Sequence, residues 1–367
     1  MPLHGSAVLT GWFRRHSARA GVGLWAILLF GMSCGSRCLA QNLTIESIDL
    51  YGLGSVSEPS VRAVLPCKAG EPLLDPEKLS GEIIRRVKAL PGVQTGHVEF
   101  VQAHPNTVLI YIGLETKGAG SGLLRFRKPP HGADQLLPEM VQAGKDFETR
   151  LMEALQHNDM QEDDSQGIAL MHYPPSREVQ ERFLRFVSQA PDLLQKVLLN
   201  SADDSQRALA GQIIGYASDR QKAVDALVRA TTDPNQDVRN NAIRALGCLA
   251  SYAQITPRPN FRIPYPPLVN LLNSPIWSDR NKAIFVLFPL TSHRDHQLLG
   301  LLRKQALPAL AEMAHWHEPG HSQGAFIVLG RIGGLSEEAI QVAWNNHNVN
   351  VVLQAAQGSF AVNPYPL

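Results

Sequence analysis

The residue types best able to do chemistry gather near the carboxyl-terminal end of the chain. His317 and His321 lie two and six residues beyond His315, and Glu318 follows His317 directly. Imidazole and carboxylate groups are common ligands of Zn²⁺ and Ni²⁺, so this spacing permits a metal site and, as one hypothesis, a metal-dependent enzyme. Pro319-Gly320 predicts a turn between helices at this point, and histidines in turns are also common on solvated surfaces.

The rest of the sequence carries no recognisable catalytic or cofactor signature. It contains no GxSxG elbow, no Walker loop, no HExxH pair and no dinucleotide-binding fingerprint. We therefore expect a protein without a cofactor that is not an enzyme.

Composition bounds the class of protein further. Of 367 residues, 44% are hydrophobic and 18% are charged, which is enough apolar material for two globular cores. A formal net charge of +1 gives no overall basic field, so we expect no nucleic-acid partner. Four cysteines in a chain of this length exclude a disulfide scaffold.

Residues 1–40 read as a targeting segment. They contain four arginines and no acidic residue, then the apolar run GVGLWAILLFGM, then small residues that lead to Ala40. This order is typical of a secretory signal peptide, and the apolar run is shorter than the roughly 20 residues of a spanning helix. The segment predicts an exported protein. An uncleaved membrane anchor and a lipid-modified Cys34, as in a lipoprotein anchoring factor, are the alternatives.

Residues 41–117 predict a small α+β domain. Apolar runs indicate strands at 43–51, 93–101 and 107–115. Between the first two, capping residues followed by apolar residues at helical spacing predict helices at 58–65 and 76–90. The order strand, helix, helix, strand, strand favours two helices on one face of a three-stranded sheet.

This segment resembles a POTRA domain, the polypeptide-transport-associated module of bacterial envelope proteins. The resemblance lies in the opening IESIDLYG, in Gly70 before Leu73, in the helix DPEKLSGEIIRRVKALPGV and in a closing strand that ends at Glu115. It implies a periplasmic or cell-envelope protein that holds polypeptides, partly by pairing an extended chain with an edge strand. The chain after residue 117 lacks the serial alternating segments of a membrane-spanning barrel, so no barrel is expected.

The outer strand of the predicted hairpin is the candidate edge. An edge strand exposes unpaired N–H and C=O groups that can bind another strand, although side chains can also blunt such an edge. The candidate partner-binding residues on this strand are Val93, Gln94, His97, Glu99 and Val101.

After a glycine- and proline-rich linker at 118–134, the chain is predicted to be helical. Residues 135–200 form a connecting segment, and residues 201–360 repeat. Similar helices begin at Asp237, Asp279 and His321, at intervals of 42 residues. The stretch DPNQDVRNNAIRALGCLA resembles a HEAT repeat, which implies an α-solenoid of helix pairs. A non-repetitive helical bundle is the alternative.

Arg239 and Asn240 occupy positions where HEAT arrays often bond the turns between repeats, or where they line the inner surface. Taken together, the sequence predicts a multidomain fold: a POTRA-like α+β domain followed by an all-α solenoid. The expected function is that of an exported adaptor or scaffold for protein or peptide partners.

Overall fold

A computed structural model describes residues 43–104, 106–117 and 120–358. The predicted signal peptide and Cys34 lie outside these residues. Within the described part, the chain forms two compact units, one of residues 127–263 and one that combines residues 43–126 with residues 264–358. These units divide the chain differently from the domain boundaries expected from sequence, because the strand-containing segment shares a unit with the last helices.

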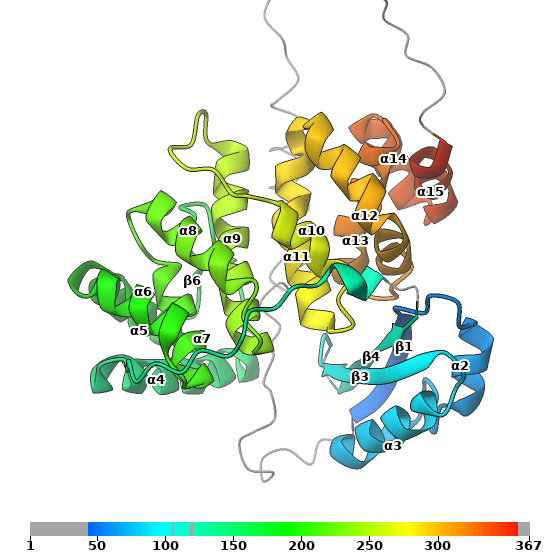
Figure 1. The fold of residues 1–367 in the computed structure, drawn as a ribbon, viewed down its shortest axis with the longest axis horizontal. Coiled ribbons are helices and arrows are strands. Elements are labelled where there is room, and N and C mark those ends of the chain that lie inside the picture. Colours follow the sequence, from blue (N-terminus) through cyan, green and yellow to red (C-terminus); the bar gives the residue numbers. More distant parts are fainter. Residues whose placement is uncertain (1–42, 105, 118–119, 359–367) are drawn as a thin grey trace, which may run out of the picture. The chain divides into compact units, whose positions relative to one another are not determined.

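The strand-containing segment has the expected order of elements, with one short strand added. Its sheet order is β2-β1-β4-β3; β1 runs parallel to β4, and β3 is antiparallel to β4 (Figure 1). The added strand has only two residues and pairs with the start of β1, so no periodicity could have indicated it. The elements are β1 (Leu43–Tyr51), α2 (Glu58–Val64), β2 (Pro72–Leu73), α3 (Pro76–Lys88), β3 (Val93–Val101) and β4 (Thr107–Thr116).

One face of this sheet forms the expected core. Val108, Ile110 and Ile112 of β4 alternate along the strand and pack with Ile83 and Val87 of α3, all at 2% exposure or less. Alternation in a strand and helical spacing in α3 each put apolar side chains on one face, and burying the two faces together stabilises the pair. The Asp75 carboxylate accepts a hydrogen bond from Lys78 N and begins α3.

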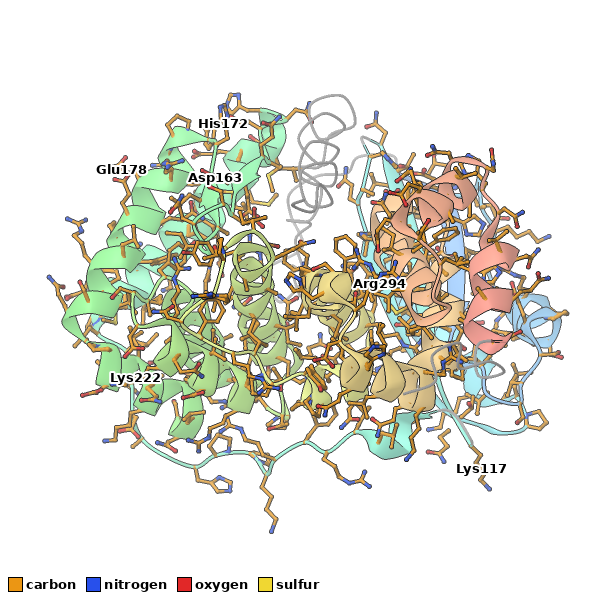
Figure 2. The ribbon with its side chains drawn as sticks, turned by 90° about the horizontal axis from the view of Figure 1, so that it is seen from above. Lys117, Asp163, His172, Glu178, Lys222 and Arg294 are labelled. Atoms are coloured by element: carbon orange, nitrogen blue, oxygen red, sulfur yellow. The ribbon has the colours of Figure 1, made fainter. Side chains whose placement is uncertain are left out.

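The carboxyl-terminal helices of the same unit form antiparallel pairs. Packing contacts join α10 to α11, α12 to α13 and α14 to α15, and α13 also packs on α11 and α15 of the neighbouring pairs. Arg294, labelled in Figure 2, links two of these pairs by donating from Nη2 to Leu335 O and to Glu337. The helices are α10 (Pro266–Leu271), α11 (Trp277–Leu290), α12 (His296–Ala314), α13 (Pro319–Ile332), α14 (Glu337–Asn345) and α15 (Val349–Gly358).

The other unit is also built mainly of helices, and α7 packs on both α6 and α9. Its elements are α4 (Pro138–Gln156), β5 (Glu162–Asp163), β6 (Leu170–Met171), α5 (Pro174–Gln189), α6 (Pro191–Asn200), α7 (Asp204–Ile214), α8 (Arg220–Ala230) and α9 (Gln236–Ile255).

The expectation of helix alone after residue 134 is wrong at one place, the hairpin of β5 and β6. Its strands are too short to show a pattern of alternation. The buried side chain of Gln180 holds the hairpin, because its Oε1 accepts from Met171 N and its Nε2 donates to Ala169 O. The hairpin is therefore held by the two hydrogen bonds of one buried amide side chain, and not by a pattern of alternating residues that could be seen in the sequence.

A recurring arginine explains part of the sequence repeat. Arg207, Arg239 and Arg280, at 2–3% exposure, each donate to the carbonyl six residues earlier in the chain. Each thereby ties the first turn of its helix to the preceding turn, and each buried guanidinium gains the partners that burial requires.

Two further observations concern membrane contact and the cysteines. Within the described residues, every helix is too short or too polar to cross a bilayer. Cys67 and Cys248 are both buried, and neither forms a disulfide within the described residues.

Candidate functional site

β3 is an edge strand, as predicted. In the described sheet it pairs only with β4, so its second edge has no strand partner. The strand is nine residues long, long enough for an extended peptide to pair along it. The backbone of β3 is therefore the first candidate binding element.

The side chains of β3 divide between the two faces of the sheet. A side chain in place of Gly96 would meet Val87 of α3 at 2.8 Å, so this position faces the core. His97 and Glu99 pair with Gly113 and Tyr111 and face the opposite side. Burial, the main cause, lowers the pKa of His97, although nearby acidic groups oppose the shift.

The five predicted residues of β3 are not equally accessible. Gln94 is exposed and lies at a register shift between Val93 and Thr95, whereas Val101 is 2% exposed. The side chain of Val101 is thus not available to a partner, while Val93, His97 and Glu99 are half-buried. A partner of β3 would therefore bind mainly to the backbone N–H and C=O groups along its open edge, and less to these side chains.

Arg239 and Asn240 have different surroundings. Arg239 is 2% exposed and donates from Nη1 to Asp233 O and Pro234 O, so it holds a turn and does not line a surface. Asn240 is half-buried, and its Oδ1 has no hydrogen-bond partner within the described residues. Of the two, only Asn240 remains a candidate contact residue.

The three histidines proposed as metal ligands do not converge. Each uses Nδ1 for a different partner: Ala311 O for His315, Asp49 for His317 and the Tyr111 hydroxyl for His321. Across the described ranges, no group of three His, Cys, Asp or Glu side chains is placed to hold a metal ion. The predicted metal site is therefore not formed by these residues.

The histidines are kept apart by the way in which α13 begins. Pro319 is the first residue of the helix, and the Glu318 side chain caps it by accepting from Gly320 N at 3.1 Å. His321 is consequently helical and 3% exposed, whereas the sequence pattern predicted a solvated turn.

His321 belongs instead to a buried aromatic cluster on the second face of the sheet. Tyr51 and Tyr111 from the strands meet Trp277 at the start of α11 and Trp316 in the connection between α12 and α13, with ring centroids 5.1–5.6 Å apart. The Tyr111 ring is stacked on Trp277, and its hydroxyl lies 2.6 Å from His321 Nδ1. Burial raises the pKa of both tyrosines and lowers that of His321 to about 3, so all three groups are neutral at pH 7.

Polar contacts surround this cluster and fix the sheet to the helices. Glu312 of α12 accepts hydrogen bonds from Gly52 N and Leu53 N just after β1, and also from Arg280 Nη1 at 2.7 Å. The Arg280 guanidinium lies over the Tyr51 ring, and the Tyr51 hydroxyl donates to Pro275 O. In Figure 1, β1 and β4 accordingly lie between α2 and α3 on one side and the carboxyl-terminal helices on the other.

Close approach makes glycine necessary at one position of this interface. A side chain at Gly113 of β4 would lie 2.0 Å from Pro275 O and 2.6 Å from the Tyr51 ring. The sheet therefore presents a surface shaped to the helices that cover it.

Sequence reasoning missed this interface. Tyr51, Asp49 and Glu312 were not candidates, because each finds its partner more than 200 residues away along the chain. One sequence signal for the interface lay in residues 107–116. There Leu109 and Tyr111, on the second face of the strand, are large and mainly hydrophobic, as are the residues on the first face. A strand that is apolar on both faces is typical of a sheet covered on both sides.

Comparisons with known proteins bear on the helical part. The family model for HEAT repeats matches residues 191–258, which run from α6 to just beyond α9. This match and the observed helix pairs show a repeat solenoid preceded by a small strand-containing region. No curated protein matches the chain.

Three solved structures with a partial likeness are designed or engineered proteins. A designed armadillo repeat protein is 16% identical over 53% of this chain and 96% of its own, with a TM-score of 0.32. An engineered protein is 16% identical over 59% of this chain and 94% of its own, with a TM-score of 0.33. Computationally designed armadillo repeat proteins for modular peptide recognition give 19% identity, coverage of 62% and 100%, and a TM-score of 0.35.

Proposed function

We propose that this protein is an exported, non-enzymatic adaptor of the bacterial cell envelope that holds polypeptide partners. In this proposal the strand-containing region is a POTRA-like module, and residues 1–40 direct export. The basic start, short apolar run and small-residue end of that segment support export. The order of strands and helices in residues 43–116 supports the POTRA-like assignment.

The observation that carries the proposal is the open edge of β3. Main-chain groups on such an edge bind an extended peptide with little dependence on its sequence, which suits a protein that handles polypeptides. Because the second face of the sheet is packed against helices, the sheet that bears this edge is held firmly. A rigid strand loses little conformational entropy on binding, and this favours affinity.

The helical repeats supply the scaffold in this proposal. Repeat solenoids are extended arrays whose surfaces commonly bind proteins. The HEAT match lies in the unit that does not contain β3, so the two binding elements belong to different compact units.

The test uses peptides that differ only in their backbone. A library of extended nine-residue peptides is screened against the full chain by fluorescence anisotropy, and the tightest binder is resynthesised with N-methyl groups on alternate residues. N-methylation on the pairing edge removes the N–H donors of the peptide while its side chains stay the same. We expect at least about a tenfold loss of affinity, equivalent to about 1.4 kcal/mol, for one of the two methylation registers.

The other register is the matched control, because its methyl groups lie on the edge that faces away from β3. Equal affinities for the unmodified peptide and both methylated forms would contradict strand pairing. The absence of any binding peptide would contradict the proposal as a whole.

A further inference from the structure

The last two helices of the described chain leave one side of the helical array open. α13 packs on α11 and on α15, and α14 packs on both α13 and α15. Within the described residues, the row of packed helices α11, α13 and α15 therefore ends at α15 (Figure 1). Because each repeat of a solenoid is covered by the next one, the outer side of the last pair is where a further element would stack.

Contacts with α13 fix which sides of α14 and α15 face inward. A side chain in place of Gly330 of α13 would collide with Ile340 of α14 and would meet Val352 of α15 at 3.4 Å. Ile340 and Val352 are buried, with exposures of 2% and 0%. Successive residues of a helix are rotated by about 100°, so Val342 and Val351 point away from α13.

The outer side of α14 and α15 is a surface of apolar and amide side chains, which we name the terminal face. Its apolar residues are Val342 and Val351, which are 58% and 37% exposed. Most of its other exposed side chains carry an amide group, and these are Asn345, Asn346, Asn350, Gln354 and Gln357.

Beyond Glu338 at the start of α14, the terminal face carries no formal charge. Residues 339–358 contain no Asp, Glu, Lys or Arg, although 18% of the whole chain is charged. The first helix of the helical part is different, because the exposed side chains of α4 include Glu139, Lys145, Glu148 and Arg150. Depletion of charged residues is the usual compositional mark of a protein interface. The terminal face therefore has the composition of a surface that is covered in the assembled protein.

The chemistry of the terminal face favours a second copy of this chain as its cover. A charged face needs a partner of opposite charge, and an identical copy would repel it. An amide group carries both N–H donors and a carbonyl acceptor, so a surface of amides can pair with an identical surface. A two-fold axis brings the same surface of two copies together, so that amides meet amides and apolar residues meet apolar residues.

We propose that two copies of this protein associate through their terminal faces in a two-fold symmetric dimer. Val342 and Val351 supply the apolar part of the contact, and the exposed amides supply its hydrogen bonds. Helices of nine and ten residues make a small interface, so the expected Kd is about 1–100 µM. Such a dimer is separate from the proposed function, and its test does not depend on peptide binding.

The experiment measures the mass of the full chain by analytical ultracentrifugation, over a concentration series that spans the expected Kd. We expect a reversible equilibrium between monomer and dimer without larger species, because a two-fold contact closes at two copies. Val342→Glu puts like charges on the two faces, so we expect the Kd to rise at least about tenfold. Ile255→Glu is the matched control, because Ile255 is 54% exposed at the end of α9, outside the terminal face. This control is expected to dimerise like the wild type.

Opposite charges at the same position separate loss of the contact from loss of folding. Val342→Lys alone should weaken the dimer as Val342→Glu does, because identical charges meet in both cases. An equal mixture of the two variants should form a mixed dimer, since each negative face now meets a positive one. Failure of the mixture to dimerise would overturn the two-fold contact.

A wild-type chain that stays monomeric at about 100 µM would also contradict the dimer, as would equal dimerisation of Val342→Glu and Ile255→Glu. A variant that ends at Gly358 tests an alternative cover, residues 359–367 of the same chain. If that variant dimerises while the full chain remains monomeric, the terminal face belongs to residues 359–367 and not to a second copy.

Discussion

The Tyr111 hydroxyl and His321 Nδ1 lie 2.6 Å apart, although 210 residues separate them in the chain. Both side chains are almost completely buried, with exposures of 0% and 3%. This contact joins the middle of β4 to the first turn of α13. It shows that the sheet and the last helix pairs form one structural unit, in which each covers apolar surface of the other.

Removing the Tyr111 hydroxyl should weaken that unit. Tyr111→Phe keeps the ring in its aromatic cluster but leaves a buried imidazole nitrogen without a partner, so we expect a loss of about 1–3 kcal/mol in unfolding free energy. Chemical denaturation measures it. Tyr252→Phe is the control, because the Tyr252 hydroxyl makes no hydrogen bond within the described residues. A loss of the same size in both variants would show that the contact contributes nothing specific.

His321 should also make the stability of this unit depend on pH. Its pKa falls from an ordinary value of 6.5 to about 3 in the folded state, first because of burial and then because Lys282 and His104 are near. The unfolded chain therefore binds more protons between these pH values, and stability must fall as pH drops from about 6.5 toward about 3. The slope from this one group reaches up to about 1.4 kcal/mol per pH unit.

The measurement is the unfolding free energy of the wild type and of His321→Gln between pH 6.5 and pH 4. Glutamine cannot titrate, so the variant should show the shallower dependence, while Asp49, whose pKa is raised mainly by burial, titrates in both proteins. Parallel curves would mean that His321 is not buried in its neutral form.

Two neighbouring residues on α9 should differ in how much stability is lost when they are truncated to alanine. Arg239→Ala removes two hydrogen bonds from a buried guanidinium to the turn before α9, and we expect a loss of about 2 kcal/mol. Asn240→Ala, one position along, should change stability by less than about 0.5 kcal/mol, because its Oδ1 has no partner within the described residues and its Nδ2 makes only one long hydrogen bond, 3.3 Å, to Asn241 Oδ1. Thermal unfolding compares the two, and equal effects would refute the structural role given to Arg239.

The sequence predicted helices and strands well where buried residues recur at the regular spacing of a strand or a helix. The alternation of Val108, Ile110 and Ile112, together with the helical spacing of Ile83 and Val87, is a direct consequence of one buried sheet face. The metal prediction failed because a proline and glycine pair was interpreted as a turn, whereas Pro319 is the first residue of a helix capped by Glu318. Proline is common both in turns and at the first position of a helix, and here the capping side chain of Glu318 shows that Pro319 begins a helix.

The docking of the sheet on the helices was not predictable in the same way. Tyr51 and Pro275, or Glu312 and Gly52, are distant in sequence, and no local period links them. Their contacts depend on how the folded surface of the sheet fits the folded surface of the carboxyl-terminal helices. This is why the candidate site of the sequence analysis contained the edge strand and not the groups that hold it in place.

Amide hydrogen exchange of residues 93–101 tests the central proposal most directly. The full chain is exchanged alone and with a permanently unfolded polypeptide, such as reduced and carboxymethylated lactalbumin, at saturating concentration. The account predicts slower exchange in β3 in the complex, by at least about tenfold at the amides that face the open edge, with residues 138–156 of α4 unchanged as the internal reference. Binding of the polypeptide with no change in the exchange of β3 would contradict it.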